Sequence, residues 1–89
     1  MDANDAQYVV CRNGVFVLPE AIVRSLQAYV THGFVYLRQD EDTLTISSTR
    51  VTDGHRRLLT GRFRAPMFRH ATRLGIVDLN DSVQVMAVR

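Results

Sequence analysis

The sequence predicts a mostly-β α+β domain, and three observations lead to this prediction. Short runs of β-branched and aromatic residues recur along the chain between turn signals. Two prolines each follow such a run and precede a stretch with the apolar spacing of a helix. The order strand–proline–helix–strand therefore occurs twice within 89 residues. A chain of this length fits one domain, so we expect residues 1–89 to fold as a single unit.

The first half begins with a predicted hairpin and helix. Residues 8–11 and 15–18 are β-prone, and they flank Asn13-Gly14, a dipeptide that favours the positive φ angles of a tight turn. Pro19 suits the first position of a helix. The apolar residues that follow are spaced as one helix face: Ile22, Leu26, Tyr29 and Val30.

Two strands complete the first half. Residues 34–37 are apolar on both faces, as in a buried strand, and residues 39–42 form a polar turn. Residues 43–47 alternate with period two, which is typical of a half-buried strand. A second tight turn is expected at Asp53-Gly54.

The second half repeats this order. Residues 56–65 form a predicted strand with Phe63 and Ala65 on one face and Arg62 and Arg64 on the other. Pro66 then opens a second predicted helix, whose apolar face and glycine cap are Met67, Ala71, Leu74 and Gly75. A turn at residues 78–81 and an alternating strand through Val83, Val85 and Ala87 complete the chain.

An internal repeat underlies these two halves. Glycine, phenylalanine and proline align between residues 14–19 and 61–66 at a spacing of 47 residues. We therefore place repeat one at residues 8–48, the joint at 49–54 and repeat two at 55–89.

Basic charge is concentrated in the second repeat. All eleven basic residues are arginine, and the net charge is +2. Residues 1–50 carry four arginines and six acids, whereas residues 51–89 carry seven arginines and three acids. Between Arg50 and Arg73, seven arginines accompany Asp53 as the only acid. Such a segment predicts a surface for an anionic partner.

The two halves also resemble the AbrB/MazE/SpoVT family of swapped-hairpin DNA-binding domains. The resemblance is carried by residues 61–66, by Leu74-Gly75-Ile76 and by residues 81–85, and more weakly by residues 8–19. It implies a small swapped-hairpin β-barrel with two short helices and a bacterial-type transcription regulator. Two units in one chain, as in MraZ-like members, imply a monomeric pseudo-dimer or a homodimer. Val15 departs from the family pattern, which has arginine after the glycine, and the chain ends one strand after the second predicted helix.

The predicted partner is duplex DNA. Arg62 and Arg64 lie two residues apart on a strand, so both project from one face and suit guanine or phosphate recognition. Arg56 and Arg57 project to opposite faces. The candidate DNA-binding residues are Arg12, Arg50, Arg56, Arg57, Arg62 and Arg64.

The sequence contains no motif that indicates catalysis, a cofactor or a metal site. His32, His55 and His70 lack metal-ligand spacing, and Cys11 lies in an apolar strand, where it should behave as a small hydrophobic residue. No phosphate loop or dinucleotide motif is present, so we expect no enzyme. One cysteine, no apolar run long enough to cross a bilayer and no signal peptide favour a cytoplasmic protein.

Two alternatives to DNA binding remain open. The chain could be a protein–protein interaction module or an antitoxin-like partner, although its only free segment, residues 1–7, is short and acidic. It could also be a scaffold whose DNA face has been lost, as Val15 suggests.

Overall fold

The computed structural model describes residues 7–88, so the acidic segment at residues 1–6 and Arg89 lie outside the described residues. The elements in chain order are β1 (Gln7–Val10), β2 (Val15–Val17), α1 (Glu20–Gln27), β3 (Phe34–Asp40), β4 (Thr43–Ser47), β5 (His55–Leu58), β6 (Arg62–Arg64), the 3₁₀ turn η1 (Pro66–Phe68), β7 (Arg73–Asp78) and β8 (Ser82–Ala87). The predicted mostly-β α+β class is confirmed. In this described part of the chain, no helix has both the length and the apolar character needed to cross a membrane.

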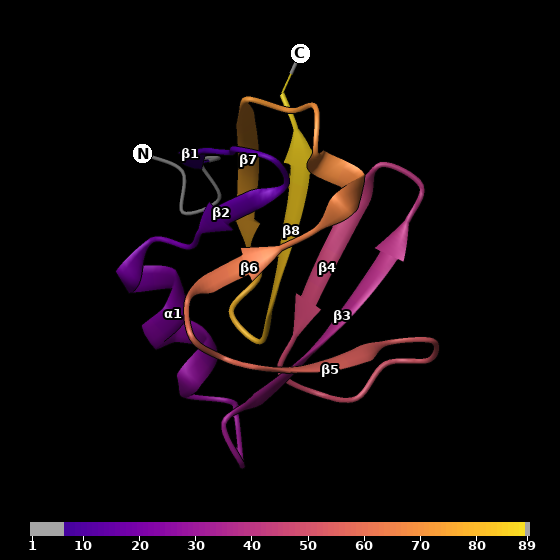
Figure 1. Ribbon diagram of the computed structural model, residues 1–89. Helices are drawn as coiled ribbons and strands as arrows, with labels where there is room; N and C mark the ends of the chain where they lie inside the picture. Colours follow the sequence, from indigo (N-terminus) through magenta and orange to yellow (C-terminus); the bar gives the residue numbers. More distant parts are fainter. Residues whose placement is uncertain (1–6, 89) are drawn as a thin grey trace.

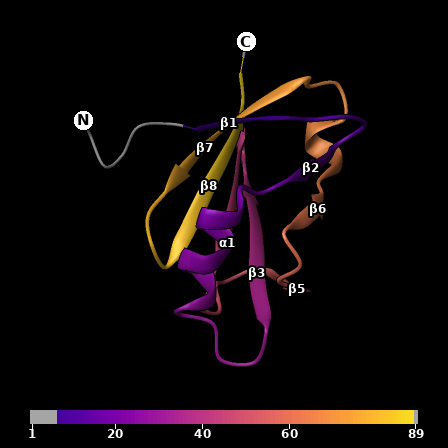
Figure 2. The same cartoon turned by 90° about the vertical axis from the view of Figure 1, so that its left-hand side faces the viewer.

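The strands form two antiparallel sheets (Figure 1). Six strands form one sheet in the order β1-β7-β8-β4-β3-β5, and β2 pairs with β6 in a separate two-stranded ribbon. The ribbon lies over one face of the large sheet, and α1 lies beside the ribbon (Figures 1 and 2). The strand order is symmetric about the centre of the sheet, where β4 pairs with β8. On one side β4 pairs with its hairpin partner β3, and on the other side β8 pairs with its hairpin partner β7.

The ribbon joins the two glycine–phenylalanine–proline segments to each other. Phe16 of β2 lies opposite Phe63 of β6. The Leu18 amide donates to the Gly61 carbonyl over 2.7 Å, and the Ala65 amide donates to the Gly14 carbonyl over 2.8 Å. Gly14 and Leu18 of the first repeat correspond to Gly61 and Ala65 of the second, 47 residues later, so the two hydrogen bonds are equivalent. The ribbon therefore has a local two-fold axis between the two phenylalanines.

The core lies between the ribbon, α1 and the inner face of the large sheet. Phe16 stacks against Phe63 with ring centroids 5.9 Å apart and meets the Phe68 ring edge-on at 6.2 Å. Ile22 and Leu26 close the core from α1. The large sheet contributes alternate residues of its four inner strands: Val35, Leu37, Leu44, Ile46, Leu74, Ile76, Val83 and Val85.

The second predicted helix is wrong. Only η1 forms after Pro66, and Leu74, Gly75 and Ile76 lie in β7 instead of at a helix end. Leu74 and Ile76 are buried on the core face, and β7 pairs with both β1 and β8. Pairing with β1 along residues 73–76 and with β8 along residues 74–78 gives this segment main-chain partners on two sides, whereas a helix at this place would leave the facing edges of β1 and β8 unpaired.

The predicted hairpin and the long predicted strand are each partly correct. Asn13 and Gly14 form the expected turn with φ angles of 52° and 78°. The strands on either side then separate, because β1 pairs with β7 and β2 pairs with β6. The strand predicted at residues 56–65 is divided into β5 and β6, because β5 pairs with β3 in the large sheet and β6 belongs to the ribbon.

The barrel implied by the family resemblance does not close within residues 7–88. β1 and β5 are the two ends of the large sheet, and each consists of four residues. The chain leaves each of these strands for the ribbon, so β1 and β5 do not pair with each other.

Replacement of Gly14 by any residue with a side chain is expected to destabilise the fold. A Cβ atom there would lie 2.6 Å from the Ala65 carbonyl oxygen, and that residue's amide is hydrogen-bonded to Gly14. Gly33 has nearly the same φ angle, 79°, with open space around it. Gly33→Ala should therefore cost about 1 kcal/mol for the left-handed backbone alone. Gly14→Ala should cost about 2 kcal/mol more because of the clash.

Urea denaturation of the two variants beside the parent chain measures this difference. Equal losses of stability in both variants would mean that the ribbon yields to the added methyl group, contrary to the geometry.

Candidate nucleic-acid interface

The outer face of the ribbon combines two valines with two arginines. Because Phe16 and Phe63 point into the core, their neighbours along each strand point away from it. Val15 lies opposite Arg64, and Val17 lies opposite Arg62. Both arginines are exposed, as their alternation in the sequence predicts.

A groove between β5 and β6 brings together four of the six candidate arginines. We call it the basic groove, and its lining residues are Phe34, Leu37, Arg56, Arg57, Leu58, Thr60, Arg62, Phe63, Arg64 and Pro66. Arg56 is held over the Phe34 ring, with its guanidinium carbon 4.5 Å from the ring centroid. Such cation–π contact fixes the side chain without neutralising its charge.

Strand pairing explains how Arg57 reaches this groove. Arg57 lies opposite Val35, and Val35 is buried on the core face of the large sheet. Residues opposite each other in antiparallel strands share a face, so Arg57 points to the side on which the ribbon lies. It remains exposed because β5 is the last strand of the sheet.

The charge of the basic groove is not neutralised by neighbouring side chains. Among the described residues, no aspartate or glutamate lines the groove. The ion pair found in this part of the chain joins Glu20 to Arg24 on α1, away from the groove. Guanidinium groups without a carboxylate partner keep their five donors for a ligand.

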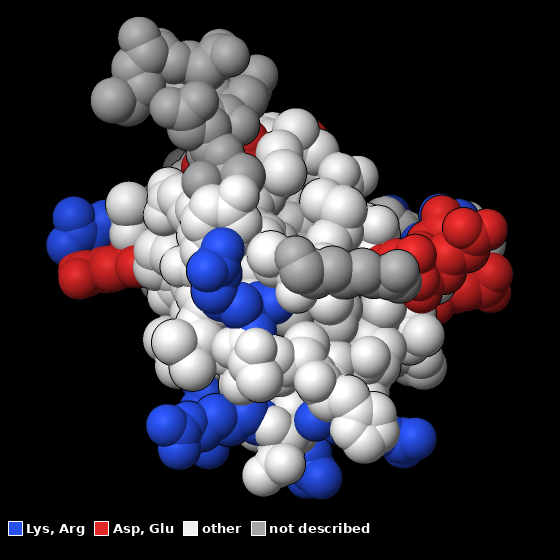
Figure 3. Space-filling view, turned by 90° about the horizontal axis from the view of Figure 1, so that it is seen from above, with Lys and Arg blue, Asp and Glu red and all other residues white. Residues whose placement is uncertain are grey.

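Several basic side chains gather on the side of the molecule that carries the ribbon. Figure 3 shows basic side chains along the lower edge of the view, which is the side that carries the ribbon in Figure 1. The acidic side chains at the right of the same view are set apart from them. The exposed acids Asp40, Glu41 and Asp42 lie at the turn between β3 and β4, and Glu41 and Asp42 line a separate hollow with Met67 and Phe68.

The other two candidate arginines lie outside the basic groove. Arg50 lines a hollow near His32 and Tyr36, which Arg56 also borders. Arg12 follows β1 and lines a different groove on the opposite side of β2, together with Arg62. The structure therefore does not bring the six arginines together on one surface.

The histidines and the cysteine are placed apart from one another. His32, His55 and His70 are all exposed, and within residues 7–88 no group of three or more His, Cys, Asp or Glu side chains is close enough to hold a metal ion. Cys11 is buried, and its thiol donates to the Phe68 carbonyl over 3.6 Å. The prediction that Cys11 packs as a small hydrophobic residue is confirmed.

Sequence reasoning missed the groove on the other side of β2. We call it the valine groove, and its lining residues are Val9, Val10, Arg12, Asn13, Val15, Phe16, Val17 and Arg62. Val10 and Val17 are 66% and 59% exposed, although both stand in runs that predict packed strands. The alignment of the two repeats at a spacing of 47 residues indicates where the two sides of the ribbon differ, because Val15 and Val17 align with Arg62 and Arg64.

Comparisons of this chain with protein-family models, with curated proteins and with solved structures found no match.

Proposed function

We propose that this protein is a DNA-binding regulator of the AbrB-like type that contacts duplex DNA through the basic groove. The observation that carries this proposal is that four exposed arginines of β5 and β6 line one groove, with no aspartate or glutamate among its described lining residues. Phosphate contacts by arginine supply most of the affinity of a protein for DNA, whereas contacts to base edges supply specificity.

The ribbon has a suitable shape for this task. A two-stranded β-ribbon fits the major groove of B-form DNA, which is about 12 Å wide. Arg62 and Arg64 project from its outer face, where a guanidinium can donate two parallel hydrogen bonds to guanine or to a phosphate. Arg56 and Arg57 stand on the neighbouring strand, and we assign them to the phosphate backbone.

The resemblance to swapped-hairpin domains supports the same proposal. The symmetric strand order and the pairing of Phe16 with Phe63 place the two repeats as two equivalent units would be placed in a dimer. We therefore propose a monomeric pseudo-dimer in which the second repeat provides the arginines.

A salt-dependent titration of duplex DNA tests this function. Anisotropy of a labelled duplex should report binding at low salt that weakens as salt rises. With four phosphate contacts, the slope of log K against log salt should be about −3.6. The absence of binding at about 0.02 M salt, or a slope near zero, would refute the proposal.

A further inference from the structure

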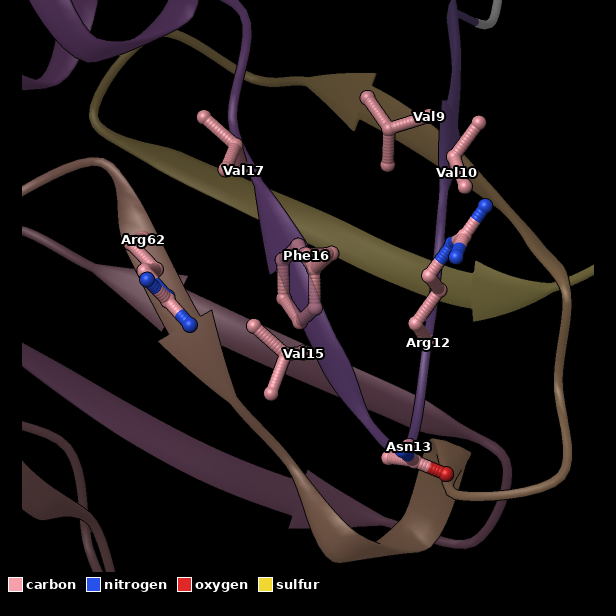
Figure 4. A pocket seen from close by; sticks show the side chains of 8 residues that line it. All are labelled: Val9, Val10, Arg12, Asn13, Val15, Phe16, Val17 and Arg62. Atoms are coloured by element: carbon pink, nitrogen blue, oxygen red, sulfur yellow. The ribbon is translucent and has the colours of Figure 1, made fainter.

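The valine groove lies between two strands that separate from a shared turn. The Arg12 amide donates to the Val15 carbonyl over 3.0 Å, and the Val15 amide donates to the Arg12 carbonyl over 2.8 Å. Beyond this closed pair, β1 continues along β7 and β2 continues along β6. Figure 4 shows the resulting gap, with Val10 on one strand and Val17 on the other.

The main chain on both sides of this gap is directed into it. The Cys11 amide donates to the Thr72 carbonyl, so the amide and carbonyl of Val10 point away from β7. The Leu18 amide donates to the Gly61 carbonyl, so the amide and carbonyl of Val17 point away from β6. Two strand edges therefore face each other, with no strand of residues 7–88 between them, and open edges of this kind are templates for strand addition.

The side chains of the groove define what such a strand must carry. Val10 and Val17 offer exposed apolar surface, Arg12 stands beside the gap, and Arg62 lines the groove from β6, across β2 (Figure 4). Among the described residues, no acid lines this groove either. A matching segment has an apolar side chain at its centre and carboxylates beside it.

Comparison with the basic groove shows that the two grooves differ in chemistry at equivalent places. Val9 of β1 lies opposite Leu74 of β7, and Arg57 of β5 lies opposite Val35 of β3. Leu74 and Val35 are each the second residue of their strand, so Val9 and Arg57 occupy equivalent places on the two end strands of the large sheet. On the ribbon, Val15 and Val17 align with Arg62 and Arg64. Three places thus carry valine in one groove and arginine in the other. The valine groove is lined by two arginines, Arg12 and Arg62, whereas four arginines line the basic groove.

We infer that the valine groove receives an extended acidic segment of a partner protein by β-strand addition. Main-chain hydrogen bonds to β1 or β2 provide affinity, and the side chains beside them select the sequence. The valines bury an apolar residue of the segment, and Arg12 and Arg62 bind its carboxylates. Arg62 lines both grooves, whereas Arg12 lines the valine groove and not the basic groove, so a substitution of Arg12 tests this inference separately from DNA binding.

A synthetic peptide tests the inference on the full chain. The probe is the fluorescein-labelled, end-blocked heptapeptide Thr-Asp-Thr-Val-Thr-Asp-Thr, which places both carboxylates and the valine on one face when extended. We expect saturable binding below about 1 mM, and about tenfold weaker binding to the Arg12→Ala variant. Arg38→Ala is the matched control, because Arg38 is an exposed arginine on β3 outside both grooves, and it should bind as the parent does.

Two modified peptides separate the components of recognition. Replacing both aspartates with lysine should abolish binding, and methylating the central amides should weaken it strongly because strand pairing is lost. The inference is overturned if the parent chain does not bind the acidic peptide, if Arg12→Ala and Arg38→Ala bind it equally, or if the methylated peptide binds unchanged. It is also overturned if mass measurement shows a second copy of the chain that blocks the peptide.

Discussion

Replacement of the four arginines of the basic groove with alanine is expected to reduce duplex DNA affinity by about three and a half orders of magnitude at 0.1 M salt. Each phosphate contact contributes about 0.9 to the slope of log K against log salt, which is roughly an eightfold gain at 0.1 M. Loss of four contacts should also reduce the magnitude of the slope by about 3.6. Anisotropy titrations of a labelled duplex at several salt concentrations measure both quantities.

A variant of equal charge separates a specific surface from general attraction. Four exposed arginines outside the basic groove can be replaced together: Arg24, Arg38, Arg69 and Arg73. Both variants lose four positive charges, so an effect of net charge alone would weaken DNA binding equally. We expect the control variant to retain most of the affinity. Equal losses in the two variants would be evidence against the basic groove as the interface.

Replacement of Phe16 with alanine is expected to destabilise the fold by about 3–5 kcal/mol. The ring is 1% exposed and contacts both Phe63 and Phe68, so its removal leaves a cavity where the ribbon meets the sheet. The surrounding strands are fixed by their hydrogen bonds and cannot fill that cavity completely. Urea denaturation followed by circular dichroism measures the loss.

Val17→Ala provides a control on the same strand. Val17 is 59% exposed, and substitutions of exposed residues usually change stability by no more than about 0.5 kcal/mol. If Phe16→Ala costs less than about 1 kcal/mol, then the phenylalanine pair does not anchor the ribbon as the structure indicates.

Local features of the chain were predictable because they depend on neighbouring residues. The turn at Asn13 and Gly14 forms as predicted. The turn predicted at Asp53-Gly54 forms one residue earlier, at Thr52 and Asp53, with the Gly54 amide donating to the Val51 carbonyl over 3.1 Å. The inward direction of Phe63 and Ala65 and the outward direction of Arg62 and Arg64 follow from the two-residue period of a strand.

The segment after Pro66 shows where local prediction fails. Met67, Ala71 and Leu74 have helical spacing, but Leu74 and Ile76 also have the spacing of a strand. The choice between the two depends on β1 and β8, which supply pairing partners on both sides of β7. The same limitation applies to Tyr29, which was expected on the buried helix face but is 52% exposed beyond the end of α1.

The candidate site was predictable in composition but not in arrangement. Sequence reasoning identified the arginines of the basic groove from their concentration between Arg50 and Arg73. It could not separate Arg12 and Arg50 from the other four, because their positions depend on which strands pair. Nor could it identify the valine groove, since its two exposed valines become recognisable only when β1 and β2 separate.

The sequence by itself determined the mostly-β class, the tight turns, the inward and outward faces of the ribbon strands and the excess of arginine in the second half. These properties depend on residues close together in the chain, where steric preference and side-chain periodicity act directly. Only the tertiary structure decided that β2 pairs with β6, that β7 is a strand and that two grooves flank one ribbon. Those outcomes depend on contacts between residues 45 to 69 positions apart, and such pairings follow from burial and hydrogen bonding across the whole domain.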